Sequence, residues 1–132
     1  MAKMVHTMIR VLDEARSLDF YQRAFGLEIV HRIDFPEFAL VYLADTAQSA
    51  FELELTINLG RAEPYDIGDG YGHVAVVVDD LEAEHARFTA AGFRPRKLVD
   101  FKNGDEQVAK FFFVADPDGY QIEVIQKGGR FH

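Results

Sequence analysis

The sequence predicts an α+β protein made of two tandem βαβββ repeats, whose curved mixed sheets surround a shared concavity. Two observations support this prediction. A short β-branched run followed by a helical pattern that ends at glycine occurs over residues 5–26 and again over 72–92. Three further strand-like runs follow each helical pattern, and self-similarity of this kind indicates an internal repeat.

In the first half, Val5–Val11 is apolar and partly β-branched and is therefore predicted to be the opening strand. Asp13–Phe25 has apolar residues at helical spacing and an acid in its first turn, and Gly26 follows as a stop signal. The remaining strands of this half are expected at Leu27–Ile33, Phe38–Leu43 and Phe51–Leu59.

The second half repeats this order, with a strand over Gly72–Val78 and a helix over Asp80–Ala91 that Gly92 closes. Its other strands are expected at about Arg94–Val99, Val108–Val114 and Tyr120–Gln126, with Asp116-Pro117-Asp118-Gly119 as a turn signal. We expect one domain over 1–132, with repeat halves at about 4–60 and 71–127 joined by a glycine- and proline-containing linker over 61–70.

Composition excludes several classes of function. The chain of 132 residues has no cysteine, so disulfide scaffolds, Cys-ligated metal sites and thiol nucleophiles are ruled out. A formal net charge of −8 argues against a nucleic-acid partner. No run approaches the roughly 20 apolar residues of a membrane span, and the start has no secretory signal pattern. We therefore expect no membrane partner and a cytoplasmic location.

Each half carries one histidine on its first predicted strand and one glutamate on its last. These are His6 with Glu54 and His73 with Glu123, at nearly the same spacing in both halves. A glutamate inside an apolar strand is costly to bury unless it is paired or bound to a metal. Two imidazoles and two carboxylates can occupy four positions around a divalent cation and leave two sites of an octahedron open. The alternative is that both histidines are ordinary strand residues and both glutamates face solvent.

Five segments of the chain closely resemble glyoxalase I (lactoylglutathione lyase), a member of the vicinal oxygen chelate superfamily. The resemblance covers nearly the whole chain and is strongest to the short bacterial group that nickel or cobalt activates. The segments are His6–Val11 (HTMIRV), Ser17–Tyr21 (SLDFY), Glu54–Gly60 (ELTINLG), Tyr71–Ala75 (YGHVA) and Asp116–Glu123 (DPDGYQIE).

The resemblance implies that His6, Glu54, His73 and Glu123 bind one divalent metal per site, with Ni²⁺ favoured over Co²⁺ and Zn²⁺. It implies isomerisation of the methylglyoxal–glutathione hemithioacetal to S-lactoylglutathione through an enediolate, and thus detoxification of methylglyoxal. It also implies a homodimer in which the first pair of ligands from one chain meets the second pair from the other.

Roles for individual side chains follow from the same resemblance. Glu123 aligns with the base that moves the proton, and Glu54 is the symmetric second candidate. Arg10 and Asn58 match positions that hold the γ-glutamyl end of glutathione. Asp69 stands where some relatives have an arginine near the glycyl carboxylate, and Lys102 or Lys110 are candidates to replace that arginine.

Two other readings remain open at the level of sequence. The first is another vicinal oxygen chelate metalloenzyme, such as an epimerase, a dioxygenase or a thiol transferase. The second is a metal-free module that binds small molecules, which needs no ligand set and should contain almost no metal.

Overall fold

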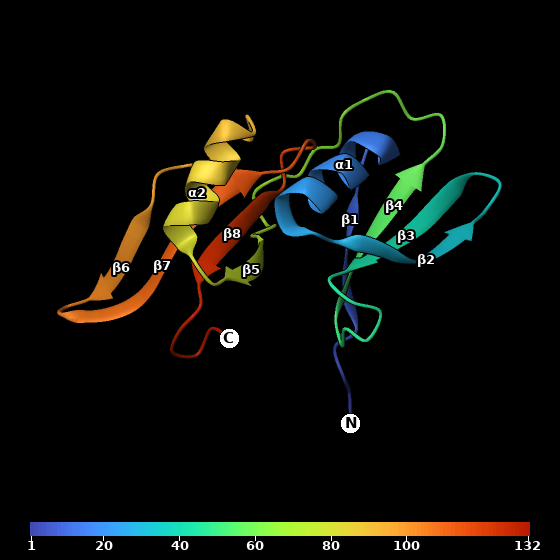
Figure 1. Ribbon diagram of the computed structural model, residues 1–132. Coiled ribbons are helices and arrows are strands. Elements are labelled where there is room, and N and C mark those ends of the chain that lie inside the picture. The colour runs from blue at the N-terminus through green and yellow to red at the C-terminus, as the bar shows by residue number, and fades with distance from the viewer. The chain divides into compact units, whose positions relative to one another are not determined.

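The computed structural model describes residues 1–132, which form two compact units over 1–66 and 67–132 (Figure 1). Each unit holds one helix and one four-stranded sheet. The elements of the first unit are β1 (His6–Arg10), α1 (Glu14–Phe25), β2 (Glu28–Asp34), β3 (Phe38–Ala44) and β4 (Glu52–Asn58). Those of the second are β5 (Val74–Val78), α2 (Leu81–Ala90), β6 (Val99–Asn103), β7 (Glu106–Ala115) and β8 (Gln121–Gln126).

The two sheets share one topology. Their strand orders are β1-β4-β3-β2 and β5-β8-β7-β6. In each sheet the first and last strands of the unit pair in parallel, and all other pairs are antiparallel. Parallel neighbours need a long connection, which the helix and the intervening hairpin supply. The predicted α+β class and tandem βαβββ order are confirmed.

Both helices begin close to their predicted starts, and an aspartate caps each one. Asp13 lies in extended backbone and its carboxylate accepts a hydrogen bond from the Arg16 amide at 3.0 Å. Asp80 also lies in extended backbone, and its carboxylate accepts a hydrogen bond from the Ala83 amide at 3.1 Å. Such caps satisfy amides that have no partner within the first turn. The first helix ends at Gly26, whose φ of 67° lies in the left-handed region that glycine tolerates.

The core of each unit lies on one face of its sheet. On β4, residues 53, 55 and 57 are buried together with Val41 of β3, and α1 runs beside this sheet (Figure 1). In the second unit, Phe88 of α2 packs edge to face on Phe112 of β7, with ring centroids 5.5 Å apart. Because side chains alternate along a strand, the even-numbered residues of β4 and the odd-numbered residues of β7 face away from these cores.

The strand predicted at about Arg94–Val99 is wrong. It forms later, as β6 over Val99–Asn103. Arg94 has a φ of 58°, which interrupts an extended chain, and Pro95 has no amide hydrogen to donate to a ladder. A tight turn at Gly104, whose φ is 66°, connects β6 to β7.

The opening strand of the second half is also shorter than predicted, because β5 starts at Val74 and leaves Gly72 and His73 before it. No helix is both long enough and apolar enough to cross a membrane.

Candidate metal and substrate site

The parallel pairing of β1 with β4 brings His6 to Glu54. In this register His6 lies opposite Glu52 and Met8 lies opposite Glu54, so the histidine and the glutamate are staggered by two residues on one face. The Nε2 atom of His6 is 3.2 Å from Oε2 of Glu54. Glu54 is 8% exposed, whereas the imidazole remains open to solvent.

The second unit repeats this arrangement with His73 and Glu123. Val74 lies opposite Ile122 and Ala75 opposite Glu123, so His73, one residue earlier, has the same two-residue stagger from its glutamate. The Nε2 atom of His73 is 2.9 Å from Oε2 of Glu123. The predicted ligands therefore come together as two equivalent pairs, one in each unit.

Each pair suits one edge of a divalent metal site. Neighbouring ligand atoms at about 2.1 Å from an octahedral cation lie about 3.0 Å from each other. The observed nitrogen–oxygen separations of 3.2 Å and 2.9 Å match such an edge. Two neutral imidazoles with two carboxylates also balance a double positive charge. Each unit supplies half of this set, and no group of three or more candidate ligands forms within either unit.

An aromatic ring supports each histidine, and sequence reasoning did not single out these rings. Tyr42 of β3 lies opposite Glu54 and meets the His6 ring edge to face at 5.8 Å. Phe113 of β7 lies opposite Glu123 and meets the His73 ring edge to face at 5.2 Å. The internal repeat could have indicated these rings, because Tyr42 and Phe113 occupy equivalent positions when the strands of the two halves are superposed.

A rigid turn sets the register of the strand that carries Glu123. Asp116 is 5% exposed, and its Oδ1 accepts hydrogen bonds from the amides of Asp118 and Tyr120, each at 2.9 Å. The Tyr120 carbonyl accepts from the Asp116 amide at 2.8 Å, and Gly119 has a φ of 96°. The predicted turn is confirmed, and it fixes where β8 starts relative to β7.

Arg10 and Asn58 lie on the same sheet face as His6 and Glu54. Arg10 pairs in register with Thr56, two residues before Asn58, near the ends of their strands. The Asn58 amide donates a hydrogen bond to the Tyr65 hydroxyl at 2.9 Å, and the Arg61 guanidinium stacks over that ring at 3.9 Å. The amide of Asn58 is thus already oriented, and Tyr65 and Arg61 are neighbours that the sequence did not reveal.

Two buried polar atoms belong to residues close in sequence to the second His–Glu pair. The Tyr71 hydroxyl and the Gln121 Oε1 atom have no hydrogen-bond partner. Both residues stand two positions before a predicted ligand, His73 and Glu123 respectively. Burial, and then the charge of Asp116, raise the pKa of the Tyr71 phenol. The phenol therefore stays protonated and can donate a hydrogen bond.

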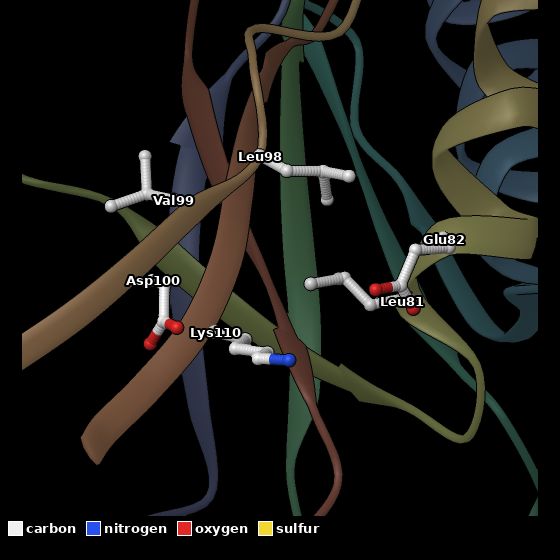
Figure 2. Close-up of a pocket in the computed structure, with 6 residues that line it drawn as sticks. All are labelled: Leu81, Glu82, Leu98, Val99, Asp100 and Lys110. Atoms are coloured by element: carbon white, nitrogen blue, oxygen red, sulfur yellow. The ribbon is translucent and has the colours of Figure 1, made fainter.

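A cavity of about 180 Å³ lies in the second unit between α2, β6 and β7 (Figure 2). Lys110 lines it with Asp100 and Glu82. Lys110 shares a strand face with Phe112, which packs under α2, whereas Glu123 faces the other side of the sheet with Phe113. The suggestion that Lys110 replaces the missing arginine is thus not supported, because its side chain points away from the Glu123 face.

Comparison with known proteins decides the family. The profile described as glyoxalase/bleomycin resistance protein/dioxygenase superfamily matches residues 3–124. The chain belongs to this superfamily. Within it, this glyoxalase-family chain is 42% identical to a lactoylglutathione lyase of Neisseria meningitidis, covering 95% of the chain and 91% of that protein. It is 39% identical to a lactoylglutathione lyase of Haemophilus influenzae, covering 94% and 92%.

Solved structures of glyoxalase I share the fold of this family member. The Zea mays enzyme aligns with a TM-score of 0.84 at 31% identity, over 96% of the chain and 45% of the maize protein. The chain thus spans less than half the length of that plant enzyme. A trypanothione-dependent glyoxalase I from Leishmania major aligns with a TM-score of 0.77 at 32% identity, over 96% of the chain and 87% of that protein. The resemblance noted in the sequence motifs is confirmed.

Proposed function

We propose that the protein is a lactoylglutathione lyase that isomerises the hemithioacetal of methylglyoxal and glutathione to S-lactoylglutathione. The observation that carries the proposal is the pair of equivalent His–Glu contacts, 3.2 Å and 2.9 Å, built on the same strand stagger in both units. The relatives named lactoylglutathione lyase, at 39% to 42% identity over most of the chain, support the same reaction and make the protein a lyase.

The proposed ligand set is His6, Glu54, His73 and Glu123. A divalent cation held by these residues would supply Lewis-acid stabilisation of the negative charge that develops on the substrate oxygens. Ni²⁺ is the favoured ion, with Co²⁺ and Zn²⁺ as alternatives, since imidazole and carboxylate ligands suit all three. Each unit holds only two ligands, which supports a homodimer in which one chain's first pair meets the partner chain's second pair.

The reaction moves one proton from carbon to the neighbouring carbon and the hydroxyl proton from the first oxygen to the second, and the chain must supply the base for the transfer between carbons. A carboxylate takes the proton from the carbon that bears sulfur, which leaves an enediolate, and returns it to the neighbouring carbon. Glu123 is the proposed base, with Glu54 as the alternative. The carbon–sulfur bond stays intact, so the hydroxyl carbon becomes the thioester carbonyl and the former ketone carbon becomes the alcohol. No external oxidant or reductant is needed.

Arg10 and Asn58 are proposed to bind the γ-glutamyl end of the thiol. A guanidinium can hold a carboxylate with two parallel hydrogen bonds. Asn58 keeps its side-chain oxygen available while its amide nitrogen donates to Tyr65. The group that holds the glycyl carboxylate stays unassigned, because Asp69 stands where some relatives have an arginine. A cytoplasmic location also stays a prediction.

Other metalloenzymes of the superfamily and metal-free binding modules are less well supported. A binding module has no need of two matched His–Glu pairs. The identity of over a third to named lactoylglutathione lyases, across nine-tenths of their length, favours that reaction over epimerase, dioxygenase or transferase chemistry.

The test is reconstitution of metal-free protein with Ni²⁺, Co²⁺ or Zn²⁺ in separate samples. Each sample is assayed for thioester formation from the methylglyoxal–glutathione hemithioacetal, and a parallel series replaces glutathione with trypanothione. We expect metal-dependent thioester formation with glutathione, greatest with Ni²⁺. Absence of thioester with every metal and both thiols, in protein that binds metal, would exclude the reaction.

A further inference from the structure

A tight turn follows β4 and reverses the direction of the chain. The Asn58 carbonyl accepts a hydrogen bond from the Arg61 amide at 3.3 Å, and Gly60 between them has a φ of 81°. A glycine with this φ at the third of four residues is typical of a type II turn. The turn keeps residues 61–65 beside the end of β4, whose last residue is Asn58.

The Arg61 side chain folds the segment after the turn into a small closed loop. Its Nε atom donates to the Glu63 carbonyl at 2.8 Å, and its Nη2 atom donates to the Pro64 carbonyl at 3.1 Å. The centre of the guanidinium lies 3.9 Å from the centre of the Tyr65 ring, and a cation over an aromatic face is attracted to it. One exposed side chain therefore holds three consecutive residues and fixes where the Tyr65 ring lies.

The Tyr65 hydroxyl closes this loop on Asn58. The Nδ2 atom of Asn58 donates to the hydroxyl oxygen at 2.9 Å, and the contact is partly buried. A phenol that accepts a hydrogen bond still has its own hydrogen to donate, and an amide whose nitrogen is engaged still has its oxygen as an acceptor. The pair thus offers one acceptor, Oδ1 of Asn58, and one donor, the Tyr65 O–H group, next to each other at the end of β4.

This combination fits the free α-amino acid end of a ligand. Such an end carries an ammonium, which only donates, and a carboxylate, which only accepts, on the same carbon. The ammonium can donate to Asn58 while the Tyr65 hydroxyl donates to the carboxylate. The observed bond between the two side chains then joins both contacts into one directed series, in which hydrogen bonds strengthen one another. Arg10, on the strand that pairs with β4, adds a positive charge for the carboxylate.

We propose that Tyr65, held in place by Arg61, is a further binding residue of this site, which selects ligands with a free α-amino acid end. Tyr65 touches the ligand carboxylate, and Arg61 is a positioning residue that acts through the Tyr65 ring. The inference rests on the proposed function and deepens it, because the ligand is the γ-glutamyl end of the thiol and the phenol adds a selective contact to those of Arg10 and Asn58.

The first test measures binding without turnover, by isothermal titration calorimetry on Ni²⁺-loaded protein. The probes are S-methylglutathione, an analogue without the α-carboxylate (γ-aminobutyryl in place of γ-glutamyl) and an analogue without the amino group (glutaryl in that place). Tyr65→Phe keeps the ring and removes only the hydroxyl. We expect this variant to bind S-methylglutathione about tenfold more weakly than wild type does, and to bind the analogue without the α-carboxylate equally well.

This comparison isolates the contact between the phenol and the carboxylate, because each of the two groups is removed in turn. A tyrosine that only supported the loop would weaken all three probes by the same factor. Equal losses for S-methylglutathione and the analogue without the α-carboxylate would therefore overturn the proposal, as would unchanged affinity for S-methylglutathione. Wild type should bind the analogue without the amino group about tenfold more weakly than S-methylglutathione. Equal affinities would exclude the ammonium contact with Asn58.

The second test asks whether Arg61 acts through Tyr65. Arg61→Ala removes the group that holds the ring, and we expect affinity for S-methylglutathione to fall several-fold. The same change in a Tyr65→Phe background should add little, since the hydroxyl that Arg61 positions is absent. Glu63→Gln is the matched control and should keep wild-type affinities, because the backbone carbonyl of Glu63, not its side chain, meets Arg61. Equal losses from Arg61→Ala in both backgrounds would contradict the positioning role.

Steady-state kinetics separates this inference from the proposed function. Tyr65→Phe should raise KM for the glutathione hemithioacetal about tenfold and leave kcat near that of wild type, because the hydroxyl contacts an end of the ligand many bonds away from the reacting carbons. A lower kcat with unchanged KM would overturn the binding role. Wild-type protein that binds the probes with the expected selectivity but forms no thioester would refute the proposed function alone, whereas active wild type without that selectivity would refute the inference alone.

Discussion

Glu123 is the residue on which turnover is expected to depend most. Glu123→Gln keeps a side-chain oxygen for the metal but cannot accept the proton bound to carbon, so turnover should fall by about 10²–10⁴ while substrate binding changes less. Steady-state kinetics with metal content measured in the same samples checks this. Glu106→Gln, an exposed change on β7, is the matched control. Unchanged turnover in a metal-loaded Glu123→Gln sample would transfer the role of base to Glu54.

The two histidines are expected to behave alike. His73→Ala and His6→Ala each remove one of the four proposed ligands, and the two histidines have the same two-residue offset from their glutamates. Metal occupancy and activity should therefore fall together in both variants. Metal analysis after gel filtration measures the occupancy. His132→Ala removes an exposed histidine outside both pairs and should keep full occupancy. Full metal content in His73→Ala would show that the ligand assignment is wrong.

At the scale of elements, the turn before β8 is the connection most sensitive to substitution. Asp116→Ala leaves two amides without the carboxylate that accepts from them, which should lower the free energy of unfolding by about 2–4 kcal/mol. Thermal and urea unfolding measure the loss. Asp116→Asn keeps one acceptor oxygen and should recover much of the stability. Equal stability of the alanine and asparagine variants would show that these bonds do not hold the turn.

At the scale of the whole molecule, the proposed dimer makes a prediction about mixtures. If one chain's first pair meets its partner's second pair, inactive His6→Ala and His73→Ala proteins should complement after subunit exchange. The heterodimer then holds one intact site and one site with both lesions. Statistical exchange places about half of the dimers in this form, so roughly a quarter of wild-type activity should return.

Exchange itself must be shown for that mixture. Native mass spectrometry of one isotopically labelled partner follows formation of the heterodimer, and each variant mixed with itself is the control. Confirmed exchange without any return of activity would mean that each chain builds its metal site alone.

Much of the fold could be predicted because its signals are local. The helix starts near Asp13 and Asp80, the stop at Gly26 and the Asp116–Gly119 turn each depend on contacts within a few residues. The predicted strand at about Arg94–Val99 failed for the opposite reason. That strand was expected because the second half repeats the order of the first, but Arg94 and Pro95 have backbone constraints that interrupt an extended strand.

By itself, the sequence determined the repeat, the two His–Glu combinations and their shared strand faces, since a period of two along each strand follows from residue order alone. Only the tertiary structure decided which strands are neighbours. Pairing of β1 with β4 joins residues nearly fifty positions apart, and that register places Tyr42 opposite Glu54 but Phe113 opposite Glu123. Such distant partners are chosen by packing of the whole sheet, because local patterns contain no information about the strand across the ladder.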